Sequence, residues 1–171
     1  MRSSSYAGLE ALVAQRGKAL LATAALLAGG RQEGEDLLQE GLERLIRVWS
    51  RIDGDAEGYL RRTLYNLAVD RWRQKRRAVI VRAGPGTVPD RSEEVALRSA
   101  LVAALAQLPP RQRVTVVLRY WEQLTEAETA DALGCSVGTV KSNSARGLAR
   151  LRELTHTWWT DDITPSQGAL R

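Results

Sequence analysis

The sequence has little of the chemistry on which disulfides, metal sites and most enzymes depend. It holds one Cys (Cys135), one His (His156) and no Phe. A single Cys excludes an internal disulfide, and one Cys with one His provides too few ligands for a zinc site. The sequence also has no Ser/His/Asp set and no phosphate-binding glycine loop. We therefore expect no cofactor, no metal and no catalysis by this chain.

Signals for β-structure are also scarce. The β-prone run Val79-Ile80-Val81 stands alone, and Gly84-Pro85-Gly86 with Pro89 interrupts any helix that follows it. The chain has 171 residues, of which 44% are hydrophobic, so a globular protein of one or two domains is expected. We predict an all-α fold with a helical domain at 1–77, an extended linker at 78–92, a second helical domain at 93–154 and a C-terminal tail at 155–171.

Residues 19–28 form a short apolar run after Lys18, like the core of a signal peptide. The run is too short to span a membrane, and acids lie on both sides of it. We interpret it as part of a buried helix at 9–28, ended by Gly29-Gly30, in a cytoplasmic protein without membrane insertion.

Residues 31–49 carry apolar side chains at helical spacing, and an acidic face lies opposite them. The apolar side is formed by Leu37, Leu38, Leu42, Leu45, Ile46 and Trp49. The acidic face contains Asp36, Gln39, Glu40 and Glu43. The net charge of the whole chain is +5, which suggests a polyanion partner. An acidic face in such a chain is either a solvated surface or a docking surface for a basic protein.

Residues 59–77 combine cations with aromatic side chains. Seven Arg or Lys residues stand against one acid, Asp70, and Tyr59, Tyr65 and Asn66 lie between them. Cations hold a phosphate backbone, while aromatic rings can stack on unpaired bases. The segment therefore suggests a helix for single-stranded or melted DNA, with Trp49 and Trp72 more typical of core residues.

The second domain is expected to have about four helices. Helices are predicted at 93–108 and, after Pro109-Pro110, at 111–122 with Val114, Val117, Leu118 and Trp121 on one face. Thr125 and Glu128 then form a capping box, Gly134 can end that helix in the left-handed conformation, and Ser136 can cap the next. Two helices joined by so short a turn predict a helix-turn-helix motif.

The second helix of this motif has the composition of a recognition helix. We expect Val140, Ala145 (weakly), Leu148 and Leu151 on its buried side. Its cations are Lys141, Arg146, Arg150 and Arg152, and no acid precedes Glu153. Cations with short polar residues near the helix start can hold phosphates and read base edges. The alternative is a solvated cationic helix in an ordinary bundle.

Four motifs, in order along the chain, resemble those of the extracytoplasmic-function class of sigma-70 RNA polymerase sigma factors. Residues 36–40 resemble the polymerase-binding motif of region 2, and 59–73 resemble the segment that reads and melts the minus-ten element. Residues 108–113 and 138–142 resemble region 4. The Trp and Arg usage is similar to the SigE-like actinobacterial branch.

The resemblance implies a non-catalytic specificity subunit of RNA polymerase. Its partners would be the β′ clamp helices and β flap of core polymerase, promoter DNA as duplex and as melted non-template strand, and in some cases an anti-sigma factor. Core polymerase would contact Asp36, Leu37, Gln39, Glu40 and Glu43. The minus-ten element would contact Arg51, Asp53, Tyr59, Arg62, Tyr65, Asn66, Arg71, Arg73, Arg76 and Arg77. The minus-thirty-five element would contact Arg111, Ser136, Thr139, Lys141, Ser142, Asn143, Arg146 and Arg150.

Asn143 departs from the family pattern, which commonly has Arg there. Asn favours a bidentate contact with adenine, whereas Arg favours guanine or phosphate, so an Asn143 side chain in the groove predicts an altered promoter preference. The competing interpretation of the whole chain is a helix-turn-helix regulator that binds duplex DNA without polymerase. Such a regulator needs neither an acidic docking face nor a helix for melted DNA.

Overall fold

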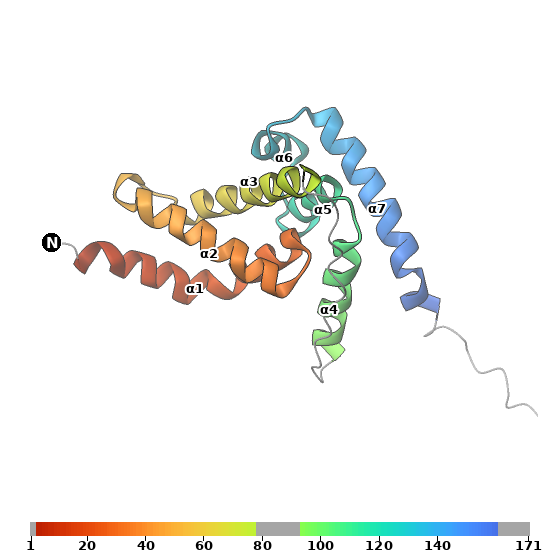
Figure 1. Ribbon diagram of the computed structural model, residues 1–171, viewed down its shortest axis with the longest axis horizontal. Coiled ribbons are helices and arrows are strands. Elements are labelled where there is room, and N and C mark those ends of the chain that lie inside the picture. Colours follow the sequence, from red (N-terminus) through yellow and green to blue (C-terminus); the bar gives the residue numbers. More distant parts are fainter. Residues whose placement is uncertain (1–2, 78–92, 161–171) are drawn as a thin grey trace, which may run out of the picture.

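The computed structural model describes residues 3–77 and 93–160, with side chains at 7–71 and 99–155. Figure 1 shows an arrangement of helices, and the described ranges contain no strand. The predicted all-α class is confirmed. The predicted linker, 78–92, and the last eleven residues lie outside the described residues. The elements are α1 (Ser3–Ala28), α2 (Arg31–Val48), the 3₁₀ turn η1 (Trp49–Arg51), α3 (Ala56–Arg77), α4 (Glu93–Ala106), α5 (Pro110–Val116), the π-helical turn η2 (Val117–Trp121), α6 (Glu126–Leu133) and α7 (Val137–Thr160).

Helices α1 and α2 form a hairpin, and α3 packs against both (Figure 1). The hairpin turns at Gly29, which has a φ of 84° and donates its N–H to the Ala25 carbonyl at 2.8 Å. Gly34 allows the two helices to come close, because a Cβ at this position would lie 2.5 Å from the Ala25 Cα. The hairpin therefore depends on a glycine that allows reversal and on a glycine that allows contact.

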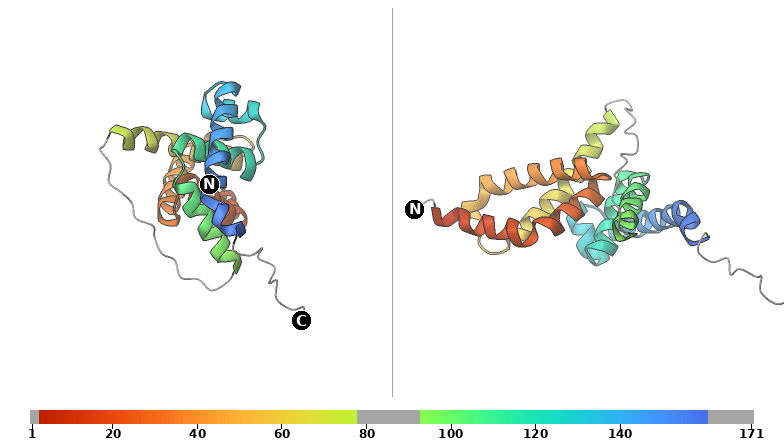
Figure 2. Two further views of the ribbon diagram at one scale, coloured as in Figure 1. Left: turned by 90° about the vertical axis from the view of Figure 1, so that its right-hand side faces the viewer. Right: turned by 90° about the horizontal axis from the view of Figure 1, so that it is seen from below.

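Helices α4 to α7 form the second unit, and they gather at one end of the α1–α3 unit (Figure 2). α5 continues into η2, whose hydrogen bonds run from the Glu122 N–H to the Val117 carbonyl at 3.0 Å. α7 packs against both α5 and α6. Gly147 makes the contact with α5 close, because a Cβ there would lie 2.7 Å from Val116 Cγ2.

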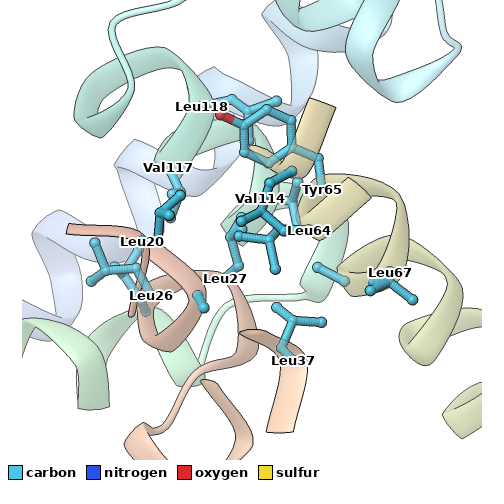
Figure 3. Packing of buried hydrophobic residues seen from close by; sticks show 14 of the residues in the cluster. Leu20, Leu26, Leu27, Leu37, Leu64, Tyr65, Leu67, Val114, Val117 and Leu118 are labelled. Atoms are coloured by element: carbon cyan, nitrogen blue, oxygen red, sulfur yellow. The ribbon is translucent and has the colours of Figure 1, made fainter. Parts of the chain in front are cut away.

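The two units share one continuous hydrophobic cluster. Leu20 and Leu27 from α1 and Tyr65 from α3 join Val117 and Leu118 from η2. Figure 3 shows the ring of Tyr65 beside Leu118, and Leu20 near Val117. Because burial of apolar surface is the main force that holds helices together, this cluster keeps the two units in contact.

The structure corrects three expectations about buried faces. Ala145 is exposed, and Ser144 at 9% exposure is buried in its place, because four residues after Val140 return to the same side of a helix. Ile46 on α2 and Trp121 at the end of η2 are 43% and 48% exposed. Ile46 directly follows the buried Leu45 and lies at the edge of the inward side of α2.

Helix α1 contains the apolar run that resembles a signal-peptide core. By length and composition alone, Ala7–Ala28 could cross a bilayer, with a mean hydropathy of 1.3. In the structure, Leu20, Ala24 and Leu27 are at most 1% exposed and belong to the shared cluster. The C-terminal half of α1 therefore serves as a core helix of the folded chain.

Candidate polymerase-binding and DNA-binding surfaces

The acidic face of α2 is at the surface. Asp36, Gln39 and Glu43 are exposed, and Glu40 is half-buried. Leu37 is 0% exposed, so its predicted contact with polymerase is corrected: its side chain belongs to the core beneath the face. The helical period explains the difference, because Leu37 lies on the inward side with Leu45 whereas its polar neighbours point outward.

Glu40 is tied to two cations. Its carboxylate pairs with Arg44 of the same helix at 2.9 Å and with Arg71 of α3 at 3.0 Å. Burial by itself would raise the pKa of Glu40, but the hydrogen bonds and charges of Arg71 and Arg44 outweigh this and hold the pKa below its usual value. Glu40 is therefore ionised and internally compensated, so Asp36 and Glu43 are the less constrained charges of this face.

Arg71 connects α3 to α2. Besides its pairing with Glu40, it donates a hydrogen bond to the backbone carbonyl of Asp36 at 3.1 Å. The sequence predicted Arg71 as a DNA contact, whereas the structure places its guanidinium between helices. The side chains of Arg73, Arg76 and Arg77 lie outside the described residues.

One face of α3 and the loop before it carry the accessible candidates for minus-ten DNA. Tyr59 is 38% exposed, Arg62 is exposed three residues after it, and Asn66 is exposed four residues after Arg62. Arg51 and Asp53 are exposed in the loop. The loop is shaped by Gly54, with a φ of 105°, and by Asp55, whose Oδ1 accepts the Gly58 N–H at 2.7 Å. Tyr59, Arg62 and Asn66 form an exposed strip along α3, which we call the minus-ten strip, and the loop lies at its N-terminal end.

Tyr65 lies on a different face of α3. It is 4% exposed, and its hydroxyl donates to a carboxylate oxygen of Glu122 at 3.0 Å. Burial and the neighbouring negative charge of Glu122 raise its pKa. Tyr65 was predicted to contact DNA, whereas in this arrangement Glu122 and Leu118 of the second unit lie against it and it is buried.

The helix-turn-helix has the local geometry that its sequence predicts. The Thr125 hydroxyl accepts the Glu128 N–H at 3.2 Å, and a Glu128 carboxylate oxygen accepts the Thr125 N–H at 2.7 Å. Gly134 ends α6 at a φ of 59°. Ser136 then accepts the Thr139 N–H at 3.2 Å and so caps α7. The capping box, the left-handed glycine and the second cap are all confirmed.

The exposed face of α7, which begins at this second cap, is cationic. Lys141 and Arg150 have side chains 63% and 50% exposed, and Ser142 and Arg146 are also exposed. Lys141 lies 3.6 Å from Glu126, and Arg150 lies 2.8 Å from Glu153. Both pairs are at the surface, where ion pairs are weak, so a phosphate can displace either acid.

The remaining DNA-binding candidates of the second unit are less uniform. Asn143 is half-buried and Arg111 is exposed. The Ser136 and Thr139 hydroxyls are hydrogen-bonded to each other at 2.9 Å, so both already serve the N-terminus of α7. Among the described residues, no group of three or more His, Cys, Asp or Glu side chains could hold a metal ion.

The sequence interpretation missed two contacts between the units. Glu122 reaches Thr23, Arg61 and Tyr65. Arg113 reaches the hairpin turn, where its Nη1 would overlap a Cβ placed on Gly29. Burial lowers the pKa of Arg113 to about 10, and the charge of Glu33 offsets part of this effect. Nothing local in the sequence marks these residues, because their partners are distant in the chain.

Two family descriptions match the chain, and they divide it as the helices do. "Sigma-70 region 2" matches residues 12–78, and "Sigma-70, region 4" matches residues 98–151. The chain is 41% identical to the RNA polymerase sigma-E factor of Streptomyces antibioticus over 86% of this chain and 84% of that one. The sigma-E factor of Streptomyces coelicolor is 40% identical, with 84% of each chain covered.

The fold is also found in a solved structure. The sigma factor RpoE from Bartonella quintana, in complex with the anti-sigma factor NepR, has a TM-score of 0.70 at 23% identity and covers 87% of this chain and 97% of that one. At this identity the likeness concerns the fold alone. Region 2, region 4 and the sigma-E relatives together establish that this chain belongs to the extracytoplasmic-function class of the sigma-70 family of RNA polymerase sigma factors.

Proposed function

We propose that this chain is an alternative sigma factor that brings core RNA polymerase to promoters carrying a minus-thirty-five and a minus-ten element, and helps to melt the DNA. The observation that carries the proposal is the exposed cationic face of α7, with Lys141, Ser142 and Arg146 on the side away from the core. Cations on a recognition helix hold phosphates, and short polar side chains near its start reach base edges.

The acidic face of α2 supplies the polymerase contact. Its exposed members are Asp36, Gln39 and Glu43, and the partner surface would be the β′ clamp helices, with region 4 on the β flap. The exposed strip on α3, with Arg62 and Asn66, then meets the melted non-template strand, where a base taken out of the stack can be held. The polymerase performs the chemistry, and this cytoplasmic subunit adds specificity.

Binding to purified core polymerase without DNA tests the first half. Asp36→Arg with Glu43→Arg should weaken binding at least tenfold, because both charges are exposed and reversed. Glu40 is left unchanged, since its reversal would also break the contact with Arg71. Glu10→Arg with Asp131→Arg makes the same charge change at exposed positions elsewhere and should bind like wild type. No binding by folded wild-type protein would instead leave a duplex-binding regulator.

Salt-dependent binding to promoter DNA tests the second half. Lys141→Ala and Arg146→Ala should each weaken minus-thirty-five binding, and loss of a phosphate contact lowers the salt slope by about 1. Asn143→Arg should change the selected sequence if the Asn143 side chain reaches the groove. Because Asn143 is half-buried, an unchanged selection would assign it to packing. The sigma factor RpoE from Bartonella quintana, which shares this fold, was crystallised in complex with the anti-sigma factor NepR, which supports such a factor as a further candidate partner.

A further inference from the structure

The Glu122 side chain of region 4 is inserted into region 2. It is 7% exposed. One carboxylate oxygen accepts the Thr23 hydroxyl of α1 at 2.6 Å, and the other accepts the Tyr65 hydroxyl of α3 at 3.0 Å and pairs with Arg61. Three donors from two helices of region 2 therefore converge on a single carboxylate of region 4. These protein donors compensate the Glu122 carboxylate only while the two units are together, and water replaces them when the units separate.

The backbone holds Glu122 in a defined position next to the helix-turn-helix. Its N–H donates to Val117 at 3.0 Å, and the Leu124 N–H donates to Leu118 at 3.0 Å. Gln123 between them has a φ of 57°. The capping box of α6 begins at Thr125, directly after Leu124. The backbone of Glu122 is thus held three residues before the capping box that begins the DNA-binding motif.

Trp121 adds a neighbouring contact across the same boundary. Its Nε1 donates to the Thr23 hydroxyl oxygen at 3.1 Å, and Thr23 is 1% exposed. The Thr23 hydroxyl therefore both accepts from region 4 and donates to it. The polar contacts are part-buried and lie next to the shared apolar cluster, in which Tyr65 packs beside Leu118 (Figure 3). Hydrogen bonds to charges are stronger at such partly dehydrated sites than in water.

This arrangement conflicts with reading two promoter elements at once. The elements are about 25 base pairs apart, which corresponds to about 85 Å along B-DNA. In the structure α6 packs directly against both α3 and α7. Because packed helices lie about 10 Å apart, the minus-ten strip on α3 and the recognition helix α7 are much closer together than the two promoter elements. When the units separate, the 15 residues from 78 to 92 can span about 50 Å, which together with the units themselves reaches the required distance.

We propose that Glu122 is a latch between region 2 and region 4, and that the latched arrangement is an autoinhibited state that must open before both promoter elements are bound. In the latched state region 4 covers Tyr65 and Arg61 on the helix that carries the minus-ten strip. The autoinhibitory part of this inference rests on the proposed function, whereas the latch itself does not.

The substitution Glu122→Gln weakens the contact between the units without destabilising region 2. Arg61 also donates to Glu57 on its own helix through Nε at 3.1 Å and Nη2 at 2.9 Å. Arg61 therefore keeps a charged partner in Glu122→Gln, and region 2 is left without an unpaired buried cation. The substitution therefore removes the charged hydrogen bonds between the units and leaves those within region 2 in place. Hydrogen bonds to a charge contribute enough that the ratio of closed to open molecules should fall at least about tenfold.

The experiment measures the separation of the units by fluorescence energy transfer in the full-length chain. Cys135→Ser removes the native thiol, and Ala14→Cys with Ala149→Cys provides one exposed dye site in each unit. Glu122→Gln should lower the transfer efficiency and raise the radius of gyration measured by X-ray scattering. Arg61→Gln, which changes the other side of the contact, should do the same. Glu35→Gln removes an exposed ion pair with Arg31 inside α2 and should change neither.

The second readout is binding to a promoter fragment that carries both elements, compared with a duplex that carries only the minus-thirty-five element. Glu122→Gln should bind the first fragment several-fold more tightly than wild type and the second equally well. Unchanged transfer in both latch variants, with native helicity by circular dichroism, would overturn the latch. Opening without tighter binding would overturn autoinhibition alone. Opening in a chain that fails to bind core polymerase would support the latch and reject the proposed function.

Discussion

Helices α2 and α3 meet through leucines, whereas α6 and α7 meet through small side chains and hydroxyl groups. In the first pair Leu37, Leu45, Leu60 and Leu64 are all 0% exposed. Gly41 lets α3 approach, since a Cβ there would lie 2.9 Å from Leu64 Cδ2. Full burial of a leucine contributes about 2 kcal/mol, so this pair is held by its own apolar contacts.

The interface between α6 and α7 is thin by comparison, because fewer large apolar side chains are buried in it. Val140 is fully buried, but beside it lie Ala130, Thr129 and Ser144. The hydroxyl oxygens of Thr129 and Ser144 are buried without a hydrogen-bond partner, which costs free energy. Gly147 places α7 directly on Val116 of α5. The comparison indicates that region 2 is rigid in itself, while the DNA-reading pair depends on caps and on α5 for its position.

The largest effect that sharpens this contrast is expected at Gly34. Gly34→Ala places a Cβ 2.5 Å from the backbone of Ala25, and neither helix can yield without moving its leucines. We expect a loss of about 2–3 kcal/mol in the free energy of unfolding, measured by urea denaturation. Gly17→Ala is the control: a Cβ there meets Val13 Cγ1 at an ordinary 3.7 Å, so it should gain about 0.5–1 kcal/mol through helix propensity. Equal effects at the two positions would contradict close packing at Gly34.

Removing the unpaired hydroxyls should strengthen the thin interface. Thr129→Val and Ser144→Ala each delete a buried oxygen without a partner, and each should stabilise the protein by about 1–2 kcal/mol, measured by hydrogen exchange of α6 and α7 amides.

Two control substitutions show whether the missing hydrogen bond is the cause. Thr115→Val removes a buried hydroxyl that donates to Arg111 O at 2.7 Å and should cost about 1 kcal/mol. Ser142→Ala changes an exposed residue of the same helix and reports the propensity effect alone. If Thr129→Val and Thr115→Val shift stability in the same direction, the assignment of unpaired groups is wrong.

The two regions also differ in how far their sequence predicts their structure. The caps of α6 and α7 were predictable because each links residues at most three apart, as Thr125 with Glu128 and Ser136 with Thr139. Helical periodicity likewise predicted the inward leucines of α2. Its limit is the edge of a stripe, where Ile46 turned out exposed and Ser144 rather than Ala145 is buried.

Contacts between distant segments were not predictable from local pattern. Glu122 binds Thr23, 99 residues away, and Tyr65, 57 residues away, and nothing near Glu122 distinguishes it from a surface acid. The same holds for Arg71, whose place in a basic run suggested DNA while its guanidinium reaches Glu40 and the Asp36 carbonyl. Close approach at Gly34 is also tertiary, since a glycine inside a helix has no local signature of what faces it.

The smallest expected effect concerns the cap on which the thin interface depends. Hydrogen bonds from the Thr125 hydroxyl and backbone N–H favour the ionised form of Glu128 and lower its pKa from the usual 4.5. Because the folded-state pKa lies below the unfolded value, the contribution of the ionised carboxylate is fully present above about pH 5. It is lost progressively as the pH falls through the lowered folded-state pKa. NMR titration of the Glu128 carboxyl should give a pKa below 4.5, and Thr125→Ala should raise it toward that value. Glu128→Gln keeps both hydrogen bonds of a capping box, so its α6 amides should lose less protection than wild type on acidification. If the Glu128 pKa is the same in Thr125→Ala as in wild type, the capping box adds nothing to α6 beyond helix propensity.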